Sequence, residues 1–274
     1  MSRGLTFLAV HAHPDDEASS TGGTFPLLAD QGVRTILVTC TNGECGDDPN
    51  GLKPEHDDHD GDLVAEVRRG DLDRAVEILN ISRHERLGFR DSGMMGWADN
   101  IHPKAFWNQD PEVACLALVE ILREERPQVI MTYNAFGFYG HPDHIQAHRI
   151  TIAALAHLDY EPTVYFNAIP TTVMNEMRAR WRQEAIDRGE EPGEESPDLS
   201  TPESEIAVSV DIAPYSGTKF DALAAHRSQI GENSGWMKMG RDGFRERMVT
   251  EWFVRATNPL HLSEPATDIF VGYR

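Results

Sequence analysis

Short runs of apolar residues alternate along this chain with longer stretches in which apolar residues recur every three or four positions. The short runs are rich in β-branched and aromatic residues, and they predict buried strands at residues 5–10, 35–40, 128–133 and 163–169. The longer stretches predict helices at residues 19–31, 62–80, 110–125 and 143–157. Strands that alternate with helices are typical of a parallel sheet covered by helices.

The last third of the chain has a less regular pattern. Residues 186–205 are rich in Pro, Glu and Ser and predict a mobile acidic loop. Order is expected to resume with IAVSVDI, an amphipathic helix near residues 215–229, and EWFVRA. No repeat or linker marks a second domain. We therefore predict one α/β domain with a Rossmann-like, mostly parallel sheet, in which a core of about residues 1–170 is followed by an extension of about residues 171–274 that closes over the strand ends.

The charge and composition of the chain exclude some classes of binding partner and indicate where the protein is located. The net charge is −20, with 25 Lys and Arg against 45 Asp and Glu and no long basic run, so we expect neither nucleic acid nor an anionic membrane as a partner. No segment approaches the ~20 apolar residues of a membrane span, and the first apolar run is too short for a signal peptide, which predicts a cytoplasmic protein. The three cysteines, Cys40, Cys45 and Cys115, predict free thiols. The oligomeric state stays open.

Histidines and acids gather directly after two of the predicted strands. HAHPDDE, residues 11–17, follows the first strand, and YGHPDH, residues 139–144, follows the third. The carboxyl ends of parallel strands share one edge of a sheet, where ligands bind, so the two clusters should face each other. Mixed imidazole and carboxylate ligands with an open position are typical of catalytic zinc. For HAHPDDE alone, a helix cap by Asp15 or Asp16 is an alternative explanation.

The pair HPDDE (13–17) and HPDH (141–144) resembles the LmbE-like, or PIG-L, family of zinc-dependent N-acetylglucosaminyl deacetylases. The resemblance covers about residues 1–157 and weakens beyond them. It implies a hydrolase that removes an N-acetyl group from a small amino sugar or glycoside with the help of Zn²⁺. Fe²⁺ would also suit such a ligand set.

The resemblance implies a role for each residue of the two motifs. The implied metal ligands are His13, Asp16 and His144. Asp15 would be the general base that takes a proton from water and passes one to the leaving amine. His141, held as an imidazolium by Asp143, would stabilise the oxyanion together with the Tyr139 hydroxyl.

Other segments resemble the members that deacetylate N-acetylglucosaminyl-inositol in mycothiol biosynthesis. These segments are RDSGM (90–94), RRGDL (68–72) and TNGECG (41–46). By this resemblance Arg68 and Asp91 would hydrogen-bond the sugar hydroxyls; the alternative is a helix-surface arginine and a loop aspartate. Ser20, a further substrate-binding candidate, stands where related mycothiol-conjugate amidases carry Lys, which favours a deacetylase over such an amidase.

One segment departs from the family pattern. Residues 133–138 read YNAFGF, and Phe136 and Phe138 add apolar bulk near the expected pocket. An aryl or larger glycoside, as in the antibiotic-tailoring members of the family, would therefore fit as well as an inositol glycoside.

Several residues outside the two motifs are interpreted without a direct role in catalysis, and two other classes of protein are less favoured. The acidic residues 47–62 match no EF-hand loop and predict a solvated loop or a pocket rim. His226 could contribute to the pocket, but a structural histidine with its hydrogen bonds satisfied is favoured. Residues 236–239 (WMKM) could form a lid, but packing in a core or against a partner is favoured. A dinucleotide-binding protein would carry a glycine-rich turn where HAHPDDE stands. A non-catalytic metal-binding protein stays possible, but it would not need Asp15 outside the ligand set.

Overall fold

The centre of the molecule is a seven-stranded sheet with the order β3-β2-β1-β4-β5-β7-β6. The computed structural model describes residues 4–189, 191, 198–258 and 264–274. The parallel strands are β1 (Thr6–His11), β2 (Arg34–Thr41), β3 (Arg83–Phe89), β4 (Val129–Thr132) and β5 (Thr163–Ala168). β7 (Thr250–Arg255) is antiparallel to β5 and to β6 (Ile206–Asp211). The predicted α/β class with a mostly parallel sheet is confirmed.

The strands that are buried on both faces are those whose apolar runs were recognised in the sequence. Every residue of β1 is buried, and in β2 only Arg34 is exposed, because helices cover both faces of these central strands. β3 reads RHERLGF and is only partly buried at the edge of the sheet. Its charged residues are typical of a protected edge strand and give no apolar run, so the sequence did not predict it.

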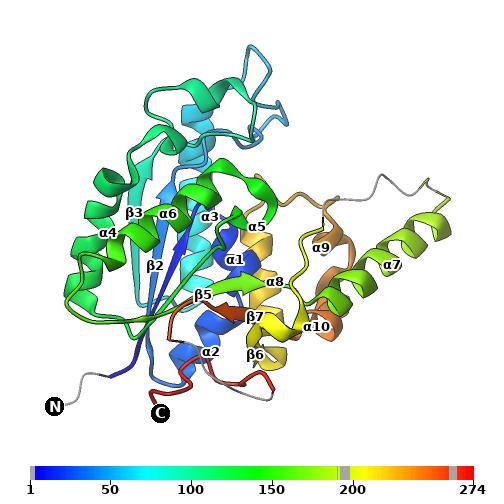
Figure 1. The fold of residues 1–274 in the computed structure, drawn as a ribbon. Helices are drawn as coiled ribbons and strands as arrows, with labels where there is room; N and C mark the ends of the chain where they lie inside the picture. Colours follow the sequence, from blue (N-terminus) through cyan, green and yellow to red (C-terminus); the bar gives the residue numbers. More distant parts are fainter. Residues whose placement is uncertain (1–3, 190, 192–197, 259–263) are drawn as a thin grey trace.

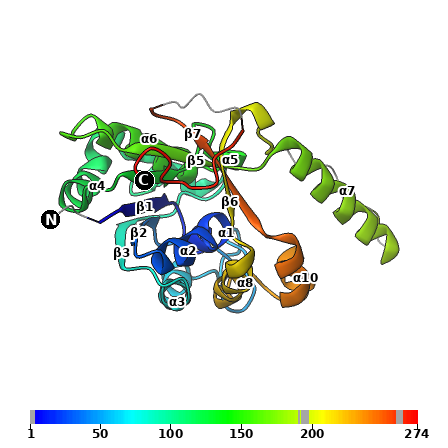
Figure 2. The same cartoon turned by 90° about the horizontal axis from the view of Figure 1, so that it is seen from below.

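Helices form a layer on each face of the sheet (Figures 1 and 2). One layer contains α4 (Pro111–Glu125) and α6 (Pro142–Leu155). The other contains α1 (Asp16–Thr21), α2 (Thr24–Asp30), α3 (Gly61–Ile78) and α8 (Ser216–Ala225). Along β1, Phe7 and Ala9 pack into the second layer, whereas Leu8 and Val10 pack into the first. This alternation follows from the two-residue period of a strand.

The helix predicted at residues 19–31 is divided in two. A Cβ on Gly23 would lie 2.5 Å from the Ile212 side chain, so the close approach of these segments requires glycine. The backbone N–H groups of Gly23 and Thr24 instead donate to the Glu251 carboxylate of β7, each at 2.9 Å. At this interruption, the start of α2 is therefore hydrogen-bonded to β7 in the C-terminal part of the chain.

The C-terminal extension lines the cavity at the strand ends, as predicted, and it also adds two strands that the sequence did not assign to the sheet. β6 and β7 join the sheet itself. α7 (Thr171–Asp187), which the sequence did not predict, projects from the body with only Met174 buried (Figures 1 and 2). In the predicted acidic loop, residues 190 and 192–197 lie outside the described residues.

The remaining elements are short. They are α5 (Gly137–Gly140), α9 (Gly235–Lys238), α10 (Gly240–Arg247), and the 3₁₀ turns η1 (Ala98–Ile101), η2 (Phe106–Asn108), η3 (Glu203–Glu205) and η4 (Ala213–Tyr215). Within the described ranges, no helix combines the length and apolarity needed to cross a bilayer.

Candidate metal centre

The two histidine and acid motifs meet at the carboxyl ends of β1 and β4. β1 ends at His11, and the chain turns directly into α1, which begins at Asp16. The neighbouring strand β4 ends at Thr132, and α6 begins at Pro142. Their position at one sheet edge is as predicted.

Three ligand atoms form a small triangle. The Nδ1 atom of His13 lies 3.4 Å from the Asp16 Oδ2 atom and 3.3 Å from the His144 Nε2 atom, and the third edge, from Asp16 to His144, is 3.5 Å. In a tetrahedral zinc site with metal–ligand distances of ~2.0–2.1 Å, the ligand atoms are about 3.3–3.4 Å apart. The three buried side chains therefore fit one metal ion and leave a position open.

A second grouping of ligand atoms is looser. Atoms of His13, His141, Asp91 and Asp143 lie within 4.8 Å of one another, and those of His13, His141 and His144 do so as well. The triangle with Asp16 fits a metal better, because its edges match tetrahedral geometry and the Asp143 carboxylate is engaged by other groups.

The Asp143 carboxylate contacts His13, a candidate metal ligand, and does not make the predicted contact with His141. Its Oδ2 atom lies 3.2 Å from the His13 Nε2 atom and accepts the Ser92 backbone N–H at 2.9 Å, while the Ser92 hydroxyl donates to Oδ1. Metal-binding histidines commonly donate their second ring N–H to a carboxylate in this way. The contact leaves the Nδ1 lone pair of His13 directed at the triangle.

The surroundings of His141 favour its neutral form over the predicted imidazolium. Its Nδ1 atom accepts the backbone N–H of Asp143 at 3.1 Å, which assigns the ring proton to Nε2. Burial, with His13 nearby, lowers the pKa of His141 to about 2. His141 can therefore donate one hydrogen bond from Nε2.

Asp15 lies beside the triangle on a strained backbone. Its φ of 132° is rare for a residue with a Cβ and costs about 1–3 kcal/mol. Its carboxylate, about a quarter exposed, accepts from Arg68 at 3.1 Å. Burial raises the pKa of Asp15 to about 6, although Arg68 opposes the shift. Asp15 is thus available as a proton acceptor beside the ligand atoms.

Arg68 is buried, so the alternative of a helix-surface arginine is wrong. It also donates to the carbonyl oxygens of Pro14 and Gly43, at 2.7 and 2.9 Å, and so fixes the turn that carries Asp15. Asp91 is buried as well; it accepts from the Gly93 N–H and lies 3.8 Å from the His13 ring. Arg68 and Asp91 therefore lie beside the metal triangle, but neither is among the residues that line the cavity.

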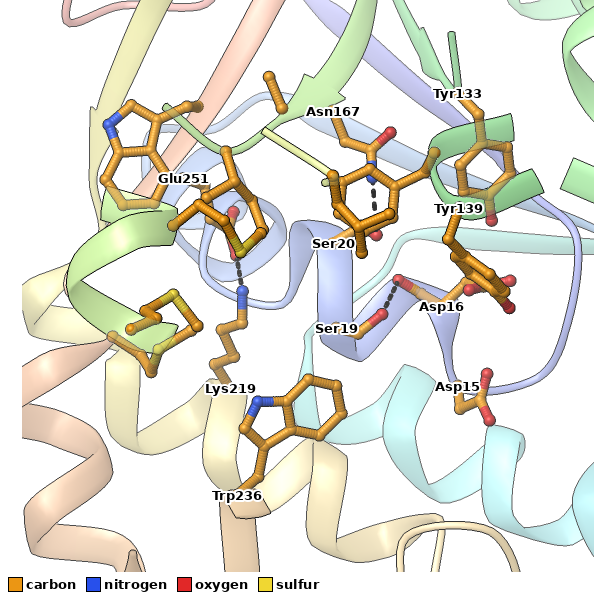
Figure 3. Close-up of a pocket in the computed structure, with 18 of the residues that line it drawn as sticks. Asp15, Asp16, Ser19, Ser20, Tyr133, Tyr139, Asn167, Lys219, Trp236 and Glu251 are labelled. Atoms are coloured by element: carbon orange, nitrogen blue, oxygen red, sulfur yellow. Dashed lines mark hydrogen bonds and ion pairs between the residues drawn. The ribbon is translucent and has the colours of Figure 1, made fainter. Parts of the chain in front are cut away.

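A cavity of about 400 Å³ opens beside Asp15, Asp16 and His144 (Figure 3). Ser20 and Tyr139 also line it, and the Tyr139 hydroxyl lies 3.5 Å from the His144 Nε2 atom. The farther wall is largely apolar and was not predicted: it includes Met174, Met177, Trp181, Ile230, Trp236 and Trp252. These side chains come from α7, β7 and the segment around α9.

Further polar groups line the cavity away from the metal triangle. Lys219 and Glu251 form a buried pair at 2.6 Å, visible in Figure 3. The Asn167 amide nitrogen lies 3.4 Å from the Ser20 hydroxyl, and its buried oxygen has no hydrogen-bond partner among the described residues.

The aromatic expectations hold in part. Phe138 lines the cavity, but Phe136 is 62% exposed and lies outside its wall. Trp236, Met237 and Met239 pack against the hydrophobic core, as predicted, and Trp236 also lines the cavity.

Most residues of 47–62 are exposed, as predicted for a solvated loop. His226 is fully buried, pairs with Glu17 and does not line the cavity. Its Nδ1 atom has no hydrogen-bond partner among the described residues, so the prediction of a fully satisfied histidine holds only in part. All three cysteines are free.

The fold and the site define a class: an α/β protein with a buried group of histidines and aspartates that could hold a metal ion, at the carboxyl edge of its parallel strands. The model of the family described as PIG-L, GlcNAc-PI de-N-acetylase, matches residues 8–155. The chain belongs to this family and is an N-deacetylase, a hydrolase of carbon–nitrogen bonds. This membership confirms the predicted resemblance.

Two relatives bear the same name, 1D-myo-inositol 2-acetamido-2-deoxy-alpha-D-glucopyranoside deacetylase. The protein of Thermomonospora curvata is 41% identical over 81% of this chain and 80% of its own length. That of Salinispora arenicola is 39% identical over 91% and 84%. Among solved structures, N,N'-diacetylchitobiose deacetylase from Pyrococcus horikoshii matches with a TM-score of 0.57 and 22% identity over 91% of this chain and 83% of its own. This likeness shows the fold alone.

Proposed function

We propose that this enzyme hydrolyses the acetamide of N-acetylglucosaminyl-inositol, which yields acetate and the free amine. The observation that carries the proposal is the triangle of His13, Asp16 and His144 with the Asp15 carboxylate beside it but outside the ligand set. Relatives at 39–41% identity, named for this substrate, support the choice of sugar.

His13, Asp16 and His144 would hold the metal, for which we propose Zn²⁺, with Fe²⁺ as an alternative. When bound, the metal polarises the amide carbonyl and makes water a better nucleophile at neutral pH. Two features of the chain support such a cation: three acceptor atoms converge within 3.5 Å, and the Asp143 carboxylate engages the far side of His13.

The other residues would move protons and stabilise charge. Asp15, oriented by Arg68, would accept the proton of the attacking water and deliver a proton to the departing nitrogen. The Tyr139 hydroxyl and the Nε2–H group of His141 are donors for the oxygen that becomes negatively charged. Since His141 donates as a neutral ring, this step needs no protonated histidine.

Arg68, Asp91 and Ser20 are the proposed contacts of the sugar. Asp91 offers a carboxylate close to the metal ligands, and Ser20 offers a hydroxyl in the cavity. We propose a small amino sugar as the only partner class, with neither nucleic acid nor membrane, in a cytoplasmic enzyme that folds as one domain. The net charge of −20 supports the exclusion of nucleic acid.

The apolar cavity wall favours a second candidate, a glycoside with an apolar aglycone. Inositol carries many hydroxyl groups, and the side chains of Met174, Met177, Trp181 and Trp236 provide few partners for them. An aryl or alkyl group would instead be removed from water at ~25 cal/mol per Å². A mycothiol-conjugate amidase is a weaker candidate, because Ser20 replaces its usual Lys.

The test is acetate release by the zinc-loaded enzyme from N-acetylglucosaminyl-inositol, an aryl N-acetylglucosaminide and a mycothiol conjugate. Acetate from the inositol glycoside, absent with Asp15→Asn, supports the proposal. Faster turnover of the aryl glycoside that Trp236→Ala abolishes would favour the second candidate. Cleavage of the conjugate without acetate release would identify an amidase, and no product from any substrate would refute all three.

A further inference from the structure

The strained turn at Asp15 is held from two sides. Arg68 of α3 binds the carboxylate at 3.1 Å. On the other side, the Asp15 backbone N–H donates to the Glu17 Oε2 atom at 3.0 Å. This second contact acts on the peptide unit whose φ of 132° sets the direction of the Asp15 side chain.

Glu17 is fully buried and is itself fixed by the C-terminal part of the chain. Its Oε1 atom lies 2.6 Å from the Nε2 atom of His226, which is also fully buried. Within the described chain, the Glu17 carboxylate has these two hydrogen-bond partners, the Asp15 N–H and the His226 ring. A buried carboxylate with few partners is held firmly by each of them, because each contact replaces lost hydration.

His226 is anchored in turn to α3. It follows directly after α8, which packs against α1 and α3. Two residues later, the Ser228 hydroxyl donates to Asp71 of α3 at 2.8 Å. Two residues of α3 therefore contribute to the position of Asp15. Arg68 binds its carboxylate directly, and Asp71 anchors the segment that carries His226.

We propose that Glu17 and His226 are positioning residues for Asp15. The His226 ring fixes the Glu17 carboxylate, which holds the Asp15 N–H and so maintains the left-handed backbone that directs the general base to the cavity. Neither residue lines the cavity or belongs to the metal triangle. His226 also lies outside residues 8–155, so the C-terminal part would contribute to proton transfer. The inference rests on the proposed role of Asp15.

The test is a double-mutant cycle on the zinc-loaded full chain, with acetate release from N-acetylglucosaminyl-inositol as the readout. We expect His226→Ala to lower kcat about tenfold, with KM and zinc content unchanged, because only the proton acceptor is displaced. In an Asp15→Asn background, the same change should alter the residual kcat less than about twofold, since the positioned group can no longer accept a proton.

Further variants separate positioning from stability. His226→Gln has an amide donor long enough to reach Glu17 and should recover part of kcat, whereas the shorter His226→Asn should not. If His226→Ala does not fold, the difference in kcat between His226→Gln and His226→Asn tests the inference instead. His157→Gln is the control: the His157 Nε2 atom lies 3.8 Å from the Glu112 carboxylate and the residue does not line the cavity, so its loss should leave kcat unchanged.

Wild-type kcat in both the Gln and Asn variants would overturn the inference. So would full multiplicativity of the His226→Ala and Asp15→Asn effects. Failure of the proposed function is distinguishable, because the wild type would then release no acetate, or Asp15→Asn would turn over as fast as the wild type.

Discussion

Asp143→Asn should weaken metal binding, although Asp143 is not a ligand of the metal triangle. The wild-type carboxylate accepts from the His13 ring at 3.2 Å and from the Ser92 N–H at 2.9 Å. An asparagine has one acceptor oxygen, and its NH₂ group would face either the His13 N–H or the Ser92 donors. The ring of His13 would lose its fixed orientation.

The expected loss is about 10–100-fold in zinc affinity, as for other carboxylates that support a ligating histidine. This corresponds to about 1.4–2.8 kcal/mol of binding free energy. The loss should reach the upper part of this range because Asp143 is fully buried, so water cannot replace the missing acceptor.

Zinc dissociation constants, measured by competition with a chelator, provide the assay. Asp48→Asn is a matched control: Asp48 is a buried aspartate that accepts the Asn50 and Leu52 N–H groups, and it lies outside the metal centre. The control should keep the wild-type zinc affinity. Zinc affinity of Asp143→Asn within twofold of the wild type would refute the role assigned to the His13–Asp143 contact.

Three other changes test separate parts of the structure. Asp15→Asn should retain zinc but lose about 10²-fold or more in kcat; unchanged kcat would exclude Asp15 as the base. His144→Ala should lose zinc, and full zinc occupancy in the variant would contradict its place in the ligand set. Arg34 and Arg83 hold the pKa of Glu125 at about 2, below its usual 4.5, so its stabilisation is present above pH ~4.5 and is lost towards pH 2. Glu125→Gln should lower the unfolding free energy by about 1 kcal/mol at pH 7, less at pH 3.5, in urea titrations; a pH-independent difference would contradict the pairing.

The sequence determined the central strands and the two motifs because both are local properties. β1 and β2 are covered on both faces, so burial appears directly as continuous apolar runs. Since strands of this kind end at a shared edge, the positions of HPDDE and HPDH after them were enough to predict one site. The sequence did not reveal β3 or α7, because neither is buried enough to leave an apolar pattern.

Only the tertiary structure decided which partner each charged side chain has. Asp143 supports His13 and not His141, Arg68 is buried against the Asp15 turn, and Glu17 meets a histidine 209 positions later. The apolar wall of the cavity is likewise assembled from segments far apart in the sequence. A local pattern records whether a residue is buried, but hydrogen-bond partners depend on distances of about 3 Å that are set by the packing of whole helices and strands.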